Sequence, residues 1–224
     1  MSVGKPRRPH IVVIDPGVKI AEIECFNALA LMAPLACTYH VPAMQGMQSL
    51  AAEDLGSAKG LIILGSASSV NDRADWQVAL EAWLKPALDK GLPTLGICYG
   101  HQMLAHMYGG KVGFLHADQA KDAGFREIQL DGAGGAPWAK GKGRVVVSHC
   151  ETVTDVPASM TVFATSAAVA TDGLRHKTLP IFSFQSHPEA TREFLNNHEI
   201  TGDDGSLAFG QGLMTRFLDY VAGI

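Results

Sequence analysis

The chain has 224 residues, of which 47% are hydrophobic and 18% charged, and its formal net charge is -4. This length suits one α/β domain with a well-buried core and is short for two domains. The lack of a basic excess argues against binding to nucleic acid or to an anionic membrane surface. We therefore expect an ordinary globular protein that acts on neither nucleic acids nor membranes.

The first nine residues are polar and basic, so we expect a loose tail over residues 1–9 and a single domain over residues 10–224. The apolar run at 11–14 is interrupted at once by Asp-Pro-Gly, which makes it too short for a signal sequence or a membrane span. Four scattered cysteines form neither a close pair nor a zinc-ligand pattern with histidine. These features favour a cytoplasmic protein with reduced thiols, and they predict no metal and no cofactor.

In the first half, short apolar runs alternate with longer amphipathic segments. Four runs are predicted strands, at 11–14, 37–41, 61–64 and 94–97. Three segments are predicted helices, at 21–31, 76–88 and 99–108. We expect Pro86 to bend its helix or end it early, and Gly109 and Gly110 to stop the third helix. This alternation predicts a mostly parallel sheet that is covered by helices on both faces.

The second half is richer in predicted strands. Four strand-like runs occur at 125–130, 144–148, 160–165 and 179–183. Glycine-rich turns such as residues 132–135 separate them, and a last helix is predicted at 212–221. We expect these strands to form an antiparallel extension of the sheet. The predicted fold is therefore a three-layer α/β domain with a β-rich extension.

The clearest chemical signal is the segment Gly-Ile-Cys-Tyr-Gly at residues 96–100, which joins a predicted strand to a predicted helix. Flanking glycines permit a strained turn that lifts a nucleophile above the carboxyl ends of the strands, where open α/β sheets bind ligands. The amino end of the next helix points its N–H groups at the sulfur of Cys98 and favours the reactive thiolate. Simple burial, which is common for cysteine, is the interpretation for Cys25, Cys37 and Cys150.

A second signal follows the last predicted strand, where residues 186–189 read Ser-His-Pro-Glu. This position lies at the same sheet edge as Cys98. Pro188 restricts the backbone, so that the carboxylate of Glu189 can fix the tautomer of His187 and support its charged form. A strand-end turn with a surface glutamate is the alternative, and the nearby elbow makes the catalytic interpretation the better one. The residues thus predict a cysteine nucleophile with a histidine base.

The segments GICYGHQ at 96–102 and SFQSHPEA at 183–190 closely resemble those of class I glutamine amidotransferases. The chain is most similar to the glutamine-hydrolysing domain of GMP synthase and its stand-alone relatives, over nearly its whole length. The resemblance implies a flavodoxin-like fold. It also implies that Cys98 attacks the glutamine carboxamide, that His187 transfers the proton and that Glu189 orients the imidazole.

The resemblance implies roles for five further residues. The backbone amides of Gly65 and Tyr99 would form an oxyanion hole, and Gln102 would contact the bound glutamine. Ser148 and His149 would hold the α-amino and α-carboxylate end of that glutamine. The loop that begins at Gly65 reads Gly-Ser-Ala-Ser-Ser-Val, where family members usually have Gly-Gly-Pro.

Three functions stay open at this point. The first is an amidotransferase that makes ammonia from glutamine for a separate synthase subunit or acceptor, because the sequence has no phosphate-binding loop and no ATP-pyrophosphatase motif. The second is a γ-glutamyl peptidase or hydrolase on the same fold, acting on γ-glutamyl compounds. The third is a non-catalytic regulatory or binding protein. The complete set of Cys98, His187 and Glu189 argues against the third.

Overall fold

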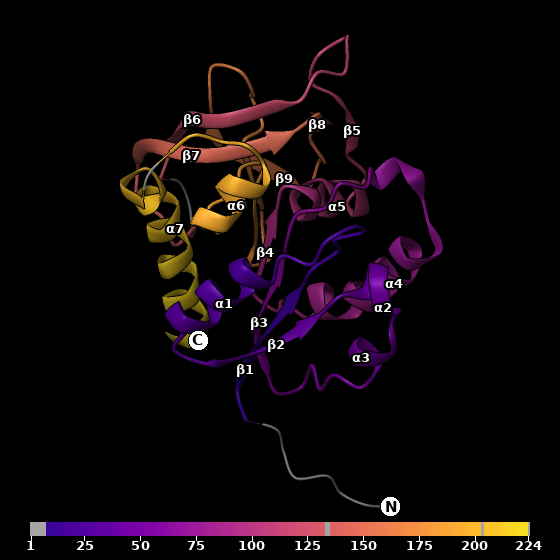
Figure 1. Cartoon of the computed structure of the whole chain (residues 1–224). Coiled ribbons are helices and arrows are strands. Elements are labelled where there is room, and N and C mark those ends of the chain that lie inside the picture. The colour runs from indigo at the N-terminus through magenta and orange to yellow at the C-terminus, as the bar shows by residue number, and fades with distance from the viewer. Residues whose placement is uncertain (1–7, 133–134, 203, 224) are drawn as a thin grey trace, which may run out of the picture.

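The computed structural model describes residues 8–132, 135–202 and 204–223 (Figure 1). Most of the predicted tail, residues 1–7, and part of the predicted glycine-rich turn, residues 133–134, lie outside the described residues. None of the described helices combines the length and the apolar character needed to cross a bilayer.

The described residues form one large mixed sheet and one small two-stranded sheet. The strands of the large sheet are β1 (His10–Ile14), β2 (Ala36–His40), β3 (Ala58–Ile63), β4 (Thr94–Ile97), β6 (Asp122–Leu130), β7 (Gly141–His149), β9 (Met160–Thr165), β10 (Gly173–His176) and β11 (Ile181–Phe184). Their spatial order is β2-β1-β3-β4-β11-β10-β9-β6-β7. From β2 to β11 neighbouring strands are parallel, and from β11 to β7 they are antiparallel. The small antiparallel sheet pairs β5 (Lys111–Phe114) with β8 (Glu151–Asp155).

Helices cover both faces of the parallel part of the sheet (Figure 1). The helices are α1 (Ile23–Met32), α2 (Pro42–Gln45), α3 (Gln48–Ala51), α4 (Asp75–Asp89), α5 (Tyr99–Met107), α6 (Arg192–Asn197) and α7 (Asp204–Gly223), with a 3₁₀ turn at Val70–Asp72. Figure 1 shows α1, α6 and α7 on one side and α2 to α4 on the other. The three-layer fold with an antiparallel extension, predicted from the sequence, is confirmed.

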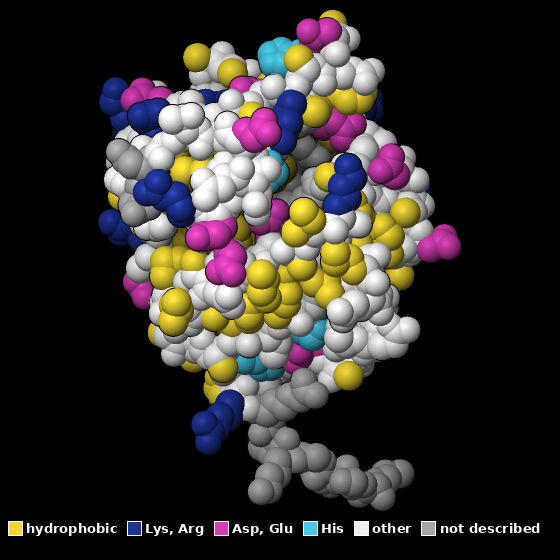
Figure 2. Space-filling view, viewed as in Figure 1, with side chains coloured by type: hydrophobic (Ala, Val, Ile, Leu, Met, Phe, Trp, Pro, Cys, Tyr) yellow, Lys and Arg dark blue, Asp and Glu magenta, His cyan; other side chains and the backbone are white. Residues whose placement is uncertain are grey.

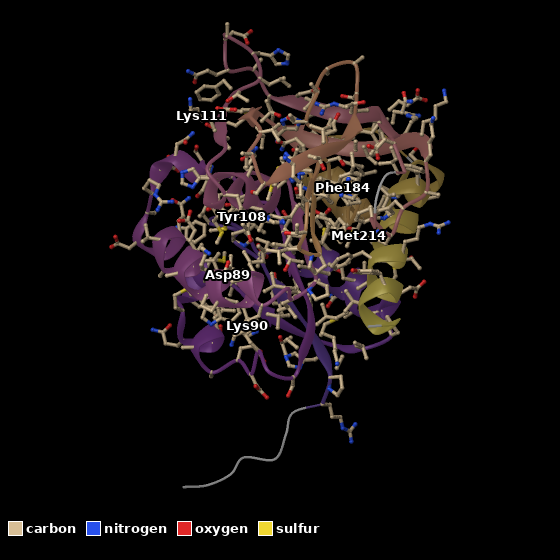
Figure 3. All side chains as sticks on the ribbon, turned by 180° about the vertical axis from the view of Figure 1, so that it is seen from behind. Asp89, Lys90, Tyr108, Lys111, Phe184 and Met214 are labelled. Atoms are coloured by element: carbon tan, nitrogen blue, oxygen red, sulfur yellow. The ribbon has the colours of Figure 1, made fainter. Side chains whose placement is uncertain are left out.

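Alternate residues of the central strands pack against opposite helix layers. Val13 and Phe184 share a core with Met214 of α7, and Figure 3 shows Phe184 and Met214 from behind. Val12 belongs to the other core, together with Leu84 of α4. All residues of β1 are buried, because a parallel strand covered on both faces has no solvent side. This double coverage explains the apolar run at the start of the chain.

Of the two expected effects of Pro86, a bend or an early end of the helix, the early end is wrong, because α4 continues to Asp89. Pro86 and Ala82, whose carbonyl would normally accept the missing hydrogen bond, are both exposed. Water can therefore reach the freed carbonyl group, which lowers the cost of the proline. Leu84 and Leu88 are fully buried and hold this part of the helix against the sheet.

The last helix is longer than predicted, because α7 begins at Asp204 instead of residue 212. Its early turns contain glycines that lie before the predicted start of the helix. One of them, Gly210, has a packing reason, since a Cβ there would lie 2.9 Å from the carbonyl oxygen of Pro188. The absence of a side chain lets α7 approach the turn that carries His187. Strands β5, β8 and β10 and helices α2, α3 and α6 were not predicted.

Candidate active site

Cys98 lies at the turn between β4 and α5, at the carboxyl edge of the parallel strands. Its backbone has φ 51° and ψ -99°, which is a strained conformation for a residue with a side chain. Cys98 is the N-cap of α5, so it lies at the positive end of the helix dipole beside the free N–H groups of the first turn. Its N–H donates to the carbonyl oxygen of Phe184 at 2.8 Å, which ties the turn to β11. The local geometry is that of an elbow that presents a thiol.

The two glycines beside Cys98 are required by close packing. A Cβ on Gly96 would lie 2.5 Å from the carbonyl oxygen of Gly100. A Cβ on Gly100 would collide with the carbonyl oxygen of Ile63 in β3. Strand β4, helix α5 and strand β3 can therefore meet at the elbow only if both positions lack side chains.

His187 and Glu189 form a hydrogen-bonded pair directly after β11. His187 Nδ1 lies 2.9 Å from Glu189 Oε1, and both side chains are almost completely buried. The N–H of His187 donates to the carbonyl oxygen of Val146 in β7 at 2.7 Å, which anchors the turn to the antiparallel extension. Phe194 of α6 packs on the imidazole with ring centroids 4.5 Å apart. These contacts fix the ring and leave Nε2 without a close hydrogen bond to any described residue.

Gly65, Cys98 and His187 converge at one point. A Cβ built on Gly65 would lie 2.8 Å from His187 Cε1 and 3.7 Å from Cys98 Cβ. A cavity of about 520 Å³ opens here. It is lined by seven of the eight predicted site residues: Gly65, Cys98, Gln102, Ser148, His149, His187 and Glu189. The side chain of Tyr99 instead packs into the core beneath α4, so only its backbone is available to the site.

The electrostatics favour a charged imidazole. Burial opposes the charge on His187, but the negative charges of Cys98 and Glu189 outweigh it and raise the pKa of His187 to about 10. The raised pKa favours the imidazolium form of His187 at neutral pH. A thiolate with an imidazolium supplies both a nucleophile and a proton for a leaving group.

Two backbone N–H groups close to Cys98 in the chain or in space have no acceptor in the part of the chain that the structure describes. Within the described residues, neither the N–H of Gly65 nor the N–H of Tyr99 donates to an acceptor. Gly65 follows β3 and Tyr99 opens α5, so the two groups flank Cys98 from adjacent strands. Unpaired, rigidly held N–H groups are suited to stabilise negative charge on a carbonyl oxygen under attack. The arrangement is of the kind that nucleophilic acyl transfer requires.

The sequence profile of class I glutamine amidotransferases matches residues 28–200 of the chain. The chain belongs to this family. GMP synthase [glutamine-hydrolyzing] of Psychrobacter arcticus is 31% identical over 169 residues, which cover 72% of this chain and 27% of that protein. The GMP synthase of Bordetella parapertussis is 27% identical over 174 residues, which cover 74% of this chain and 29% of that protein. The chain therefore spans less than a third of the length of these relatives.

Solved structures show the same fold. A glutamine amidotransferase from Thermotoga maritima superposes with a TM-score of 0.76 at 17% identity, and the match covers 98% of this chain and all of that one. A glutamine amidotransferase from Methylobacillus flagellatus has a TM-score of 0.70 at 17% identity, covering 97% of this chain and 95% of that one. At these identities the likeness establishes the fold of this amidotransferase family member and not its substrate.

Gln102 takes part in a buried relay that the sequence did not reveal. Its Nε2 donates to the carbonyl oxygen of Glu151 at 2.8 Å and to Gln185 Oε1 at 3.2 Å. Gln185 in turn donates from Nε2 to the sulfur of Cys98 at 3.8 Å. Both amide hydrogens of Gln102 are thus engaged within the protein, and only its oxygen remains for a ligand. Gln185 lies within residues 183–190, the segment that resembles the amidotransferase family. Its place in that segment was the signal, but its contact with Cys98 is visible only in the structure.

His149 lines the cavity, but both of its ring nitrogens have protein partners. Nδ1 lies 2.9 Å from the carbonyl oxygen of Glu151, and Nε2 lies 3.0 Å from a guanidinium nitrogen of Arg126. Burial and the charge of Arg126 lower the pKa of His149 to about 4, so it is neutral. Ser148 Oγ lies 3.0 Å from His198 Nδ1. The side chains of this segment are therefore already hydrogen-bonded within the protein.

The loop between β1 and α1 is a part of the site that sequence reasoning missed. Five of its residues line the cavity: Gly17, Val18, Lys19, Ile20 and Glu22. Asp15, which is fully buried, accepts from the N–H groups of Gly17 at 2.8 Å and Glu22 at 2.6 Å and so shapes the loop. The Asp-Pro-Gly segment was a visible turn signal, but nothing in it indicated proximity to Cys98.

Proposed function

We propose that the chain is a cysteine-dependent glutaminase that hydrolyses the side-chain amide of glutamine through a γ-glutamyl thioester. The observation that carries the proposal is the convergence of Cys98 and a glutamate-paired His187 around Gly65 in one cavity. Membership of the class I amidotransferase family makes glutamine the first substrate to test.

In the proposed first half-reaction, the thiolate of Cys98 attacks the γ-carbonyl carbon, and the N–H groups of Gly65 and Tyr99 stabilise the oxyanion. The imidazolium of His187 gives its proton to the nitrogen as the C–N bond breaks, so that ammonia leaves as a neutral molecule. In the second half-reaction, neutral His187 takes a proton from water, which attacks the thioester and releases glutamate and the thiolate. Glu189 supports the imidazolium in both halves.

We further propose that the ammonia is passed to a partner or acceptor in the cytoplasm. The support is that the similar bacterial proteins are GMP synthases, which makes a synthase the first partner to test. Gln102 and the backbone at Ser148 and His149 would hold the amino-acid end of glutamine. No metal or cofactor takes part in the proposed reaction.

The proposal is tested by labelling and by ammonia release. A glutamine-analogue electrophile should modify one cysteine, and peptide mapping should place the adduct on Cys98. Replacing Cys98→Ser should abolish labelling and reduce ammonia release from glutamine by orders of magnitude. Labelling mainly at Cys25, Cys37 or Cys150, or an equally active Cys98→Ser variant, would refute the assignment.

A second candidate function is hydrolysis of larger γ-glutamyl compounds at the same site. It is favoured by the cavity of about 520 Å³, which extends past the reacting atoms to the loop between β1 and α1. Ammonia needs no such space, whereas an amine with substituents does. The chemistry at the γ-carbonyl is the same for both functions, so the leaving-group end of the cavity decides between them.

A further inference from the structure

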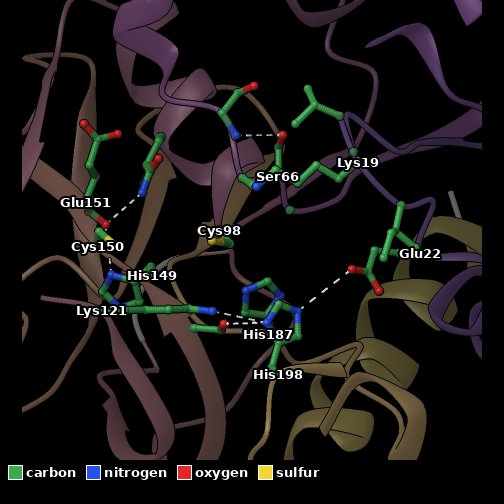
Figure 4. Close-up of a pocket in the computed structure, with 18 of the residues that line it drawn as sticks. Lys19, Glu22, Ser66, Cys98, Lys121, His149, Cys150, Glu151, His187 and His198 are labelled. Atoms are coloured by element: carbon green, nitrogen blue, oxygen red, sulfur yellow. Dashed lines mark hydrogen bonds and ion pairs between the residues drawn. The ribbon is translucent and has the colours of Figure 1, made fainter. Parts of the chain in front are cut away.

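The cavity has two chemically different ends on either side of Cys98. Figure 4 shows Cys150 and Glu151 on one side of the sulfur, and Lys19 and Glu22 on the other. The first end is polar and lies against β7 and β8. The second end is formed by the loop between β1 and α1, which has apolar and charged side chains.

In the proposed reaction the γ-carbon of the substrate becomes tetrahedral, and the directions of its four substituents assign a role to each end of the cavity. The γ-carbon would bind the sulfur of Cys98, with its oxygen toward Gly65 and its leaving nitrogen toward His187. The fourth substituent, the glutamyl chain, must take the remaining direction, toward Gln102 and Glu151. Any group attached to the leaving nitrogen therefore extends to the opposite end, along the loop between β1 and α1.

That loop offers an apolar surface and one unpaired cation. Val18 is 38% exposed and Ile20 is 69% exposed, although both line the cavity. Lys19 forms no ion pair with any described residue. Glu22 accepts from the thiol of Cys25 at 3.8 Å and lies 4.0 Å from His198 Nε2. Burial lowers the pKa of His198 to about 4, so that ring is neutral and Lys19 is the cation nearest to Glu22 on this loop.

We propose that this loop is a leaving-group subsite that recognises an amino acid with an apolar side chain and a free carboxylate. The substrates would be γ-glutamyl dipeptides such as γ-glutamyl-valine, in addition to glutamine. Lys19 binds the carboxylate, and Val18 and Ile20 contact the side chain. The inference rests on the proposed thioester chemistry and extends it to a larger leaving group.

The reaction balances without any added reactant except water. The thiolate of Cys98 forms the C–S bond, and the peptide C–N bond breaks as His187 protonates the nitrogen of valine. Water then cleaves the thioester, with His187 as base. The products are glutamate and free valine, and the thiolate is regenerated.

The test compares four substrates: γ-glutamyl-valine, γ-glutamyl-valinamide, γ-glutamyl-glycine and glutamine. The valinamide has a neutral amide in place of the carboxylate. The ratio of kcat/KM for γ-glutamyl-valine to kcat/KM for γ-glutamyl-valinamide therefore isolates the effect of the negative charge. We expect the wild-type chain to prefer the carboxylate about fivefold at low ionic strength, because an exposed ion pair is worth roughly 1 kcal/mol at most. The preference should fall as salt is added. Valine should be preferred over glycine about tenfold, through its contact with the apolar side chains.

The variant Lys19→Met should remove the preference for the carboxylate and keep the preference for valine over glycine. Lys90→Met is the matched control, because Lys90 is exposed at the end of α4 and does not line the cavity (Figure 3). It should retain both preferences.

Two outcomes would overturn the subsite while the proposed function stands. In both, glutamine forms a thioester on Cys98. In the first, the valinamide is hydrolysed as well as or better than γ-glutamyl-valine, which would indicate a neutral or cationic leaving group. In the second, Lys19→Met leaves the ratio unchanged. Absence of turnover and of thioester on every substrate would instead refute the proposed function, and the subsite with it.

Discussion

At the scale of single residues, the charge on His187 depends on its two neighbours. Burial alone would lower the pKa of His187, and the charges of Cys98 and Glu189 reverse this effect. We predict that Cys98→Ala lowers the pKa of His187 from about 10 toward its ordinary value, as measured by NMR titration of the imidazole. An unchanged titration would show that the sulfur does not carry the negative charge.

The raised pKa of His187 also has a consequence for stability. Unfolded histidine titrates near pH 6.5, so the folded chain retains this proton up to about pH 10. The contribution of His187 to stability is therefore complete below about pH 6.5 and is lost as the pH rises toward 10. Urea unfolding between pH 7 and 10 should show a smaller loss of stability in Cys98→Ala than in the wild-type chain.

Gln185 acts at the same scale through its contact with the sulfur. It is fully buried and donates to Cys98 Sγ, while Gln102 holds its oxygen. We predict that Gln185→Leu slows alkylation of Cys98 by iodoacetamide at pH 7 by about threefold to tenfold, because a donor to a charged group is lost. The control Gln129→Leu, at an exposed position in β6, should not change the rate. If Gln185→Leu leaves the alkylation rate unchanged, Gln185 only packs beside Cys98 and does not stabilise its thiolate.

At the scale of elements, the loop after β3 must pass close to the catalytic ring. Because a Cβ on Gly65 would lie 2.8 Å from His187 Cε1, Gly65→Ala should displace the imidazole while keeping the backbone N–H of the proposed oxyanion hole. A displacement of about 1 Å is expected to lower kcat/KM for glutamine about 100-fold. Gly212→Ala is the control, since nothing lies within 4 Å of a Cβ there. Full activity of Gly65→Ala would mean that the loop can yield without disturbing His187.

Helix α4 contains a proline, Pro86, that is expected to lower its stability. Pro86 lies inside the helix on its exposed face, where alanine could restore the hydrogen bond to Ala82 without a new contact. We predict that Pro86→Ala stabilises the chain by about 1–3 kcal/mol. This corresponds to about 2–4 °C in Tm for each kcal/mol in a chain of this size, measurable by calorimetry. A lower Tm would indicate that the proline sets a helix geometry that the core requires.

At the scale of the whole molecule, we predict that the isolated chain hydrolyses glutamine slowly and that a synthase partner raises the rate. The oxyanion loop from Gly65 to Val70 is rich in small residues, and such a loop can exchange between misaligned and aligned states at low cost. A partner that binds only the aligned state shifts that population. Hydrophobic side chains gather on the face seen in Figure 2. Ile20 and Ile23, just before and at the start of α1, are 69% and 45% exposed.

The measurement is ammonia release by the purified chain, alone and with the synthetase region of a GMP synthase added as a separate chain. Acceleration of glutamine hydrolysis would support the amidotransferase function. Fast turnover of γ-glutamyl peptides without a partner, together with negligible glutamine hydrolysis, would make the second candidate function the principal one.

The sequence by itself was sufficient for the fold class and for the nucleophile elbow. Buried parallel strands appear as apolar runs, and a tight strand-to-helix turn requires glycines, so both leave local signals, as at Gly96 and Gly100. Short strands such as β5 and β10 left no such signal, because they are stabilised by partners distant in the chain. The predicted last helix was too short because Gly210 is an unfavourable residue for a helix. It is accommodated in α7 because only a residue without a side chain fits against Pro188.

Only the tertiary structure decided which loops meet at the cavity. The loop between β1 and α1 lies beside Cys98 because β1, β3 and β4 are neighbours in a parallel sheet, whose carboxyl ends share one edge. The approach of Gln185 to the sulfur and the engagement of His149 by Arg126 depend on contacts across many residues of chain. Local sequence patterns report the backbone near a residue, whereas a binding site is formed by side chains that the packing of the whole domain brings together.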